Sequence, residues 1–286
     1  MTRPNFFIVG HTRSSTTSLE INLMQHPEIF VVSNLKGYFG FQTHYKSENE
    51  YLEIFKNVKN EKCIGERNTD YLFCSSTASR LKKFTPNAKI LLILRNPIDV
   101  MYSLHSKMYL VEMIENISDF EKALQEESKR LEENIISPET HPPQIVYRTV
   151  VKYAKQISKY YDEFGKDNVK IIIFDEIHKN TKEVYKEIFE FLKVDSSFNP
   201  DFHTVNQNRN PRSRLLHSLF KKNQNFFTII GKIPGISKFY LSINLPVTKR
   251  TTINPELRRN LQKELLPEIE ELSKLLNKDL TYWCKN

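Results

Sequence analysis

The stretch FFIVGHTRSSTTSLEINL, residues 6–23, decides which fold the chain can adopt. Its first five residues, Phe6 to Gly10, form an apolar run that ends in glycine, which predicts a short buried strand. Leu19 and Leu23 follow with helical spacing. A strand, a tight turn and a helix start together form an anion site, because the first N–H groups of a helix lack partners within it.

The loop between this strand and this helix is rich in hydroxyl groups. It contains Arg13 and the run Ser14, Ser15, Thr16, Thr17 and Ser18. Aligned on Gly10, it lacks the second glycine and the lysine of the phosphate loop of nucleoside triphosphatases, because Ser15 and Thr16 stand there. Hydroxyl residues also cap helices routinely. These residues alone therefore leave a phosphate site and a plain helix cap as equal alternatives.

Three further apolar runs, at 29–32, 90–94 and 169–174, are strand-like, and helical periodicity fills the segments between them. This alternation predicts an α/β fold with a central parallel sheet flanked by helices. Residues 112–143 are charged and predict a helical insertion over the sheet edge, outside the core.

Two helices are predicted after the last strand. One covers 181–194, with an apolar face made by Val184, Ile188, Phe191 and Leu192. The other covers 253–276 and has Pro255 near its first turn, where proline is tolerated.

Composition indicates a globular protein of ordinary type. The chain has 286 residues, 39% hydrophobic and 27% charged, so one domain spanning 1–286 is expected. No apolar run approaches the ~18 residues of a membrane helix, and the first residues lack a signal-peptide pattern. Cys63, Cys74 and Cys284 have unrelated spacings and predict reduced thiols. We therefore expect a cytoplasmic protein without a membrane partner.

The net charge of +8 favours an anionic partner, such as a nucleotide, a sulfated or phosphorylated substrate, or nucleic acid. A sequence rich in lysine and asparagine is also basic through composition alone. Charge by itself therefore does not select a function.

Several segments resemble the sulfotransferases that use 3′-phosphoadenosine 5′-phosphosulfate (PAPS). The family carries a PRSGTTSL loop and a His-Pro after its first strand, then GEKTPxYL, LLLRxPxxRxxSxY, a helix leading to FLG, and a closing dxxxW. The matching segments here are residues 6–31, GERNTDYLF (65–73), LLILRNPIDVMYSLHSKM (91–108), FDEIHKNTKEVYKEIFEFLKV (174–194) and LNKDLTYW (276–283). Their order is the same from one end to the other. The chain is thus identified as a member of this family, closer to its bacterial and heparan-type branch.

The resemblance implies a fold similar to that of P-loop nucleoside triphosphatases, PAPS as donor, 3′-phosphoadenosine 5′-phosphate (PAP) as product, and no metal. Arg13 stands at the position of the cation in the family's phosphosulfate loop, and the hydroxyl residues Ser14 to Ser18 would hold the 5′-phosphate. Arg95 and Ser103 match the pair that binds the 3′-phosphate. A strand-end surface arginine is the alternative for Arg95.

Further cofactor contacts are implied at Tyr153, Lys249 and Arg250. The motif around Tyr153 is only partly matched, because Val151 replaces the family's glycine. Lys249 and Arg250 lie where the family clamps the 3′-phosphate a second time, and a solvated surface pair explains them equally well.

The residues at the transferred group follow the family less closely. Arg67 falls on the lysine of GEK and is expected to face the transferred group. Leu35 occupies the position of the heparan-type general base, so another group is needed. His44 is the first candidate because an imidazole titrates near neutral pH, and Glu66 is the second. A surface histidine and a structural glutamate are the alternatives.

The phosphosulfate loop departs from the family pattern at two positions. Ser15 replaces the usual glycine and Thr12 the usual proline. The loop must then accept a Cβ where backbone normally approaches phosphate, or follow a wider path.

The acceptor is expected to be a small molecule, a natural product with a hydroxyl or amine, and a glycan is the alternative. Its walls are predicted at 110–147 and 225–246, and no nucleic-acid partner is expected. A nucleotide or sugar kinase and a non-catalytic nucleotide binder are more remote alternatives, the first lacking the GK pair of kinases.

Overall fold

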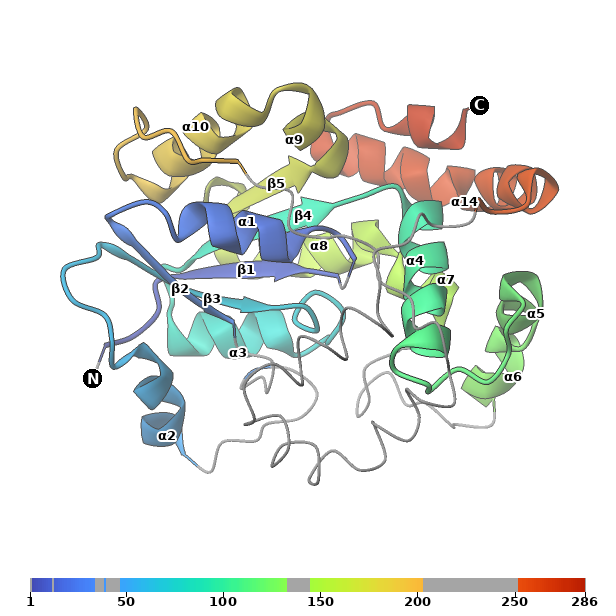
Figure 1. The fold of residues 1–286 in the computed structure, drawn as a ribbon, viewed down its shortest axis with the longest axis horizontal. Coiled ribbons are helices and arrows are strands. Elements are labelled where there is room, and N and C mark those ends of the chain that lie inside the picture. The colour runs from blue at the N-terminus through green and yellow to red at the C-terminus, as the bar shows by residue number, and fades with distance from the viewer. Residues whose placement is uncertain are drawn as a thin grey trace, which may run out of the picture.

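The computed structural model describes residues 2–11, 13–33, 39, 47–132, 145–202 and 252–285. These residues form a parallel five-stranded sheet with the strand order β2-β3-β1-β4-β5 (Figure 1). The strands are β1 (Phe6–Gly10), β2 (Ile29–Ser33), β3 (Cys63–Asn68), β4 (Lys89–Leu94) and β5 (Val169–Ile173). Because every pair is parallel, all five strands end at one edge of the sheet. The predicted α/β fold with a parallel sheet is confirmed.

Strand β3 has no counterpart in the sequence prediction, whereas the other four strands were expected. Its sequence, CIGERN, places the polar residues Glu66, Arg67 and Asn68 in buried positions. Apolar periodicity is therefore absent although the strand lies between β1 and β2. Gly65 of this strand packs against Phe6, where an added Cβ would come within 2.2 Å of the ring. The sheet needs a glycine there.

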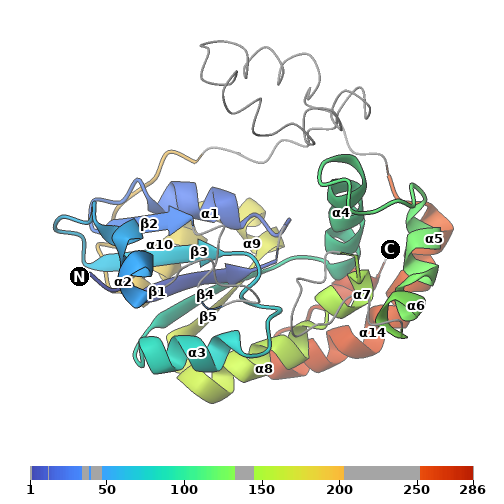
Figure 2. The ribbon, with the colours of Figure 1, turned by 90° about the horizontal axis from the view of Figure 1, so that it is seen from below.

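Helices cover both faces of the sheet (Figure 2). On one face lie α1 (Thr16–Leu23), α9 (Phe174–Lys179) and α10 (Thr181–Leu192). On the other lie α3 (Thr77–Phe84) and α8 (Tyr153–Phe164), with α14 (Pro255–Leu276) packed along α8. Helix α4 (Pro97–Leu110) starts after β4 and leads away from the edge where the strands end.

The shorter elements lie around this framework. They are α2 (Glu48–Leu52), η1 (Glu53–Phe55), α5 (Phe120–Gln125), α6 (Glu127–Glu132), α7 (Tyr147–Val150), η2 (Lys166–Asn168) and η3 (Thr281–Cys284). Among all the described helices, none combines the length and the apolar character that crossing a membrane requires.

The sheet separates two hydrophobic cores. Phe6 and Ile8 of β1 pack with α1 and α10, whereas Phe7 and Val9 face the larger core beneath α3, α8, α4 and α14. His26 joins α1 to the segment after α10, because its Nε2 donates to the Asp195 carbonyl oxygen at 3.0 Å. Strand β1 therefore contacts both cores, and the loop that follows it begins between the two helical layers.

Two predictions about helices need correction. Ile188 and Leu192 are buried on α10 as expected, but Tyr185 and Phe189 complete its core face, and Val184 and Phe191 are only partly buried. The predicted insertion is not wholly outside the core, because Phe120, Ala123 and Leu124 of α5 belong to the larger core. Residues 133–144 of that segment lie outside the described residues.

Candidate functional site

The loop after β1 turns tightly into helix α1. Ser15 is the N-cap residue and has φ 67° and ψ 21°, the left-handed region, without a side-chain cap bond. Arg13 also has a positive φ, 78°. An added Cβ at Gly10 would lie 2.8 Å from Cγ2 of Thr16, so the strand end and the helix start are in close contact. This geometry brings together the N–H groups of the first helical turn, which have no partner within the helix itself, as an anion site requires.

Helix α1 carries the predicted hydroxyl residues in its first turn. Thr16 is buried, and Thr17 and Ser18 are half-buried. Ser14 is fully buried, and its Oγ has no hydrogen-bond partner within the described part of the chain. A buried hydroxyl without a partner costs about 1–3 kcal/mol. A ligand oxygen at the loop would remove that cost.

The β4–α4 junction brings the other predicted residues to the same loop. Arg13 Nε donates to Ser103 Oγ at 2.6 Å, and Arg95 Nη1 donates to the Arg13 carbonyl oxygen at 3.2 Å. The Arg95 guanidinium lies 4.7 Å above the Phe174 ring. Its Nε is buried and lacks a partner among the described residues. Two cations and a hydroxyl thus meet beside the start of α1, and this set suits an anionic ligand such as a phosphate.

Tyr153 lies behind this set rather than at its surface. The side chain is fully buried, and its hydroxyl donates to the Arg95 carbonyl oxygen at 3.1 Å. Burial raises the pKa of Tyr153. Tyr153 therefore contacts the backbone that carries Arg95.

Glu66 points to the α3 side of the sheet. It is fully buried, and the hydroxyl of Tyr71 donates to its Oε1 at 2.6 Å, while that of Tyr51 donates to its Oε2. Both carboxylate oxygens are therefore engaged.

Arg67 points to the opposite face, toward α1. Its Nε donates to Glu20 Oε2 at 2.5 Å, and its Nη2 donates to Ser33 Oγ at 2.6 Å. The Ser33 hydroxyl in turn donates to the Glu20 carboxylate at 2.6 and 2.7 Å. Arg67 and Glu20 are both buried and form an ion pair. Neither Glu20 nor Ser33 was predicted from the sequence.

A second pair that the sequence did not indicate lies at the root of the loop. His11 Nε2 and Gln156 Oε1 are 2.9 Å apart. Burial lowers the pKa of His11 to about 4, so its imidazole is neutral at pH 7. His44, Lys249, Arg250 and the predicted acceptor wall 225–246 lie outside the described residues.

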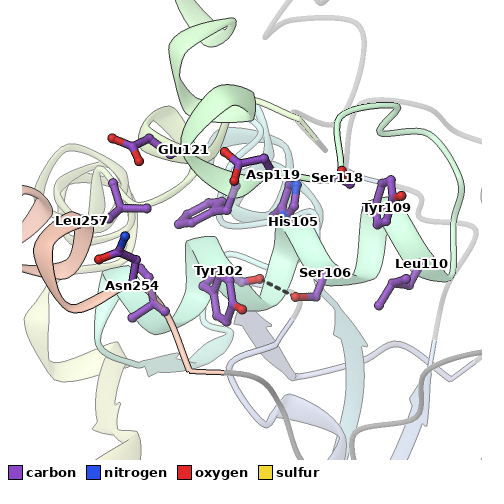
Figure 3. Close-up of a pocket in the computed structure, with 12 residues that line it drawn as sticks. Tyr102, His105, Ser106, Tyr109, Leu110, Ser118, Asp119, Glu121, Asn254 and Leu257 are labelled. Carbon is purple, nitrogen blue, oxygen red and sulfur yellow. Dashed lines mark hydrogen bonds between the residues drawn. The ribbon is translucent and has the colours of Figure 1, made fainter.

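A cavity of about 330 Å³ lies beside α4 (Figure 3). Its walls include Tyr102, Ser106 and Tyr109 of α4, with Asp119 and Glu121 at the start of α5. Ser106 is one helical turn beyond Ser103. Residues 110 and 118–121, which belong to the predicted acceptor wall, line this cavity.

The chain is similar in sequence to known proteins. The family model of the sulfotransferase domain matches residues 3–226, and the chain belongs to this family. Membrane-associated sulfotransferase kil1 of Dictyostelium discoideum is 34% identical over 100 residues, which are 34% of this chain and 21% of that protein. Bifunctional heparan sulfate N-deacetylase/N-sulfotransferase 1 of Caenorhabditis briggsae is 24% identical over 201 residues, 67% of this chain and 23% of that protein. The chain spans about a fifth of the length of these curated relatives.

Solved structures confirm the fold. A sulfotransferase from Alicyclobacillus acidocaldarius matches 99% of both chains with 26% identity and a TM-score of 0.74. Mouse sulfotransferase SULT7A1, complexed with PAP, covers 100% of this chain and 89% of its own, with 13% identity and a TM-score of 0.53. The predicted sulfotransferase fold is therefore correct.

Ser15→Gly should stabilise the protein. Glycine removes the strain of a side chain in the left-handed region, which is about 1–2 kcal/mol. It also increases the conformational entropy of the unfolded chain, which destabilises the folded state by only about 0.4–1 kcal/mol. We expect a rise in melting temperature of a few degrees, measured by calorimetry. Ser18→Gly within α1 is the matched control and should lower it. A lower melting temperature for Ser15→Gly would contradict the strain at this position.

Proposed function

We propose that the protein transfers a sulfuryl group from PAPS to a hydroxyl or amine of a small-molecule acceptor. The observation that carries this proposal is the meeting of Arg13, Arg95 and Ser103 beside the start of α1. The buried Ser14 Oγ and Arg95 Nε lack partners within the described residues, so these groups fit a ligand with phosphate oxygens. Membership of the sulfotransferase family supports the same donor.

The residues then divide between the two phosphates of the nucleotide. The hydroxyl residues Ser14, Ser15, Thr16, Thr17 and Ser18, with the backbone N–H groups of α1, would hold the 5′-phosphate. Arg95 and Ser103, joined by Lys249 and Arg250, would hold the 3′-phosphate. Tyr153 would support this second site through the backbone of Arg95.

Transfer breaks the bond between sulfur and the 5′-phosphate oxygen and forms a bond between sulfur and the acceptor oxygen or nitrogen. Negative charge then grows on the phosphate, and Arg13 would stabilise it as the group leaves. Arg67 would contribute from the end of β3, although Glu20 already balances its charge.

A base must remove the proton of the acceptor hydroxyl or amine, and we assign this role to His44. Leu35 replaces the glutamate of the heparan-type branch. Glu66, the second candidate, is fully buried and already accepts hydrogen bonds from Tyr51 and Tyr71, which favours a structural role. An imidazole is largely neutral at pH 7 and can accept a proton.

The cavity beside α4 is the proposed acceptor subsite. Its charged lining residues, among those described, are Asp119 and Glu121, and burial lowers the pKa of His105 there, which keeps it neutral. Two carboxylates disfavour an anionic glycan and favour a neutral or amine-bearing small molecule. Tyr102 and Tyr109 add aromatic surface for such a ligand.

Arg95→Ala should remove the preference for PAP over AMP. A charge-assisted hydrogen bond contributes about 1.5–3 kcal/mol, so PAP affinity should fall about 10- to 150-fold, and AMP affinity should fall much less. Isothermal calorimetry on the wild type and the variant, with PAP, AMP and ATP, measures this.

Arg3→Ala is the matched control for Arg95→Ala. The Arg3 guanidinium also lies over an aromatic ring, 4.6 Å from the centroid of Phe84, but it is remote from the loop. Its nucleotide affinities should equal those of the wild type. Equal affinity of the wild type for PAP and AMP would contradict both the proposed 3′-phosphate site and PAPS as the donor.

A further inference from the structure

Gln156 fixes the orientation of His11, the first residue of the loop after β1. Both side chains are buried although they are 145 positions apart in the sequence. Gln156 Nε2 donates to the carbonyl oxygens of Val150 and Thr149 at 3.1 and 3.4 Å. These two bonds direct the amide nitrogen away from His11. Oε1 of Gln156 therefore accepts the proton on Nε2 of His11, at 2.9 Å.

The corner between α7 and α8 contacts both segments that form the candidate nucleotide site. Gln156 holds the segment after β1 through His11. Tyr153, one turn earlier on α8, holds the segment after β4 through the Arg95 carbonyl oxygen and packs its ring 5.6 Å from that of His11. The same corner thus contacts both sides of the site.

The loop needs such support because its backbone is strained. Arg13 and Ser15 both have positive φ without being glycine, which costs about 1–2 kcal/mol at each position. The turn closes on His11 itself, since Ser14 N–H donates to the His11 carbonyl oxygen at 3.2 Å. Fixing His11 therefore fixes the residue from which the strained turn begins.

We propose that His11 and Gln156 are positioning residues for nucleotide binding, which hold residues 13–15 in the shape that receives the 5′-phosphate. The inference rests on the proposed function. These two residues act through the backbone of the loop. Their removal should therefore weaken every ligand that has a 5′-phosphate to the same extent, whereas Arg95→Ala should weaken ligands with a 3′-phosphate far more than ligands without one.

Gln156→Leu tests this inference by calorimetric titration with PAP and with AMP. Loss of the buried hydrogen bonds should weaken both nucleotides about five- to tenfold, and the ratio of the two affinities should stay constant. Gln262→Leu is the matched control, because Gln262 of α14 is also a buried glutamine. Its Nε2 donates to the Lys285 carbonyl oxygen at 3.3 Å. Its nucleotide affinities should stay within about twofold of the wild type.

His11→Phe provides an independent variant if Gln156→Leu fails to fold. It keeps a ring against Tyr153 and should show the same loss, and the double variant should lose no more than either single one. PAP affinities within about twofold of the wild type in both single variants would overturn the inference while leaving the proposed function intact. A wild type that binds neither nucleotide would overturn both.

Discussion

Arg13→Ala should lower the rate of sulfuryl transfer about 10²- to 10³-fold, the effect of removing one donor that stabilises transition-state charge. Arg13 is held at the start of α1 by its bond to Ser103, and Arg95 fixes its backbone. Negative charge on the leaving phosphate is greater in the transition state than in PAPS, because the bond to sulfur is breaking. The rate constant should therefore fall more than PAPS affinity does. PAP formation from PAPS with a panel of small phenols, alcohols and amines measures the rate.

Arg13→Lys separates charge from geometry. It keeps the positive charge but loses the planar fork, so the rate should recover only in part. Arg3→Ala, at an exposed ion pair with Glu48, should leave the rate unchanged. A rate constant of Arg13→Ala within about threefold of the wild type would show that another group carries the leaving-group charge.

The sequence predicted the elements whose signals are local. Strands β1 and β4 are continuous apolar runs because both of their faces are covered, and the loop residues 13–18 lie together in the sequence. Strand β3 escaped prediction because its inner residues are polar. Glu66 accepts a hydrogen bond from Tyr71, and Arg67 donates one to Glu20. Hydrophobic periodicity along the sequence gives no information about such partners.

The supporting residues of the site lay beyond sequence reasoning for the same reason. Arg67 pairs with Glu20 across 47 positions, and His11 with Gln156 across 145. Neither spacing belongs to a motif, because the fold alone brings these residues together. The roles of Arg13, Arg95 and Ser103 could be predicted because these residues stand at positions of the family motifs.

Arg67→Met should destabilise the protein by about 3–5 kcal/mol, because it leaves the buried Glu20 without its partner. The melting temperature should then fall on the order of 10 °C, measured by calorimetry. Lys62→Met is the control, since it breaks a pair with Glu28 in which the lysine side chain is 68% exposed. It should cost less than about 1 kcal/mol. Equal losses in the two variants would contradict a buried ion pair at Arg67.

Combining Arg67→Met with Glu20→Leu distinguishes a structural from a catalytic role of Arg67. Replacing both partners of a buried pair by apolar residues is often neutral for stability, so the double variant should recover most of the lost melting temperature and bind PAP. If Arg67 also faces the transferred group, sulfuryl transfer should remain low in this stable protein. Full transfer in the double variant would show that Arg67 only joins β3 to α1, and Arg13 would then be the main cation for the leaving group.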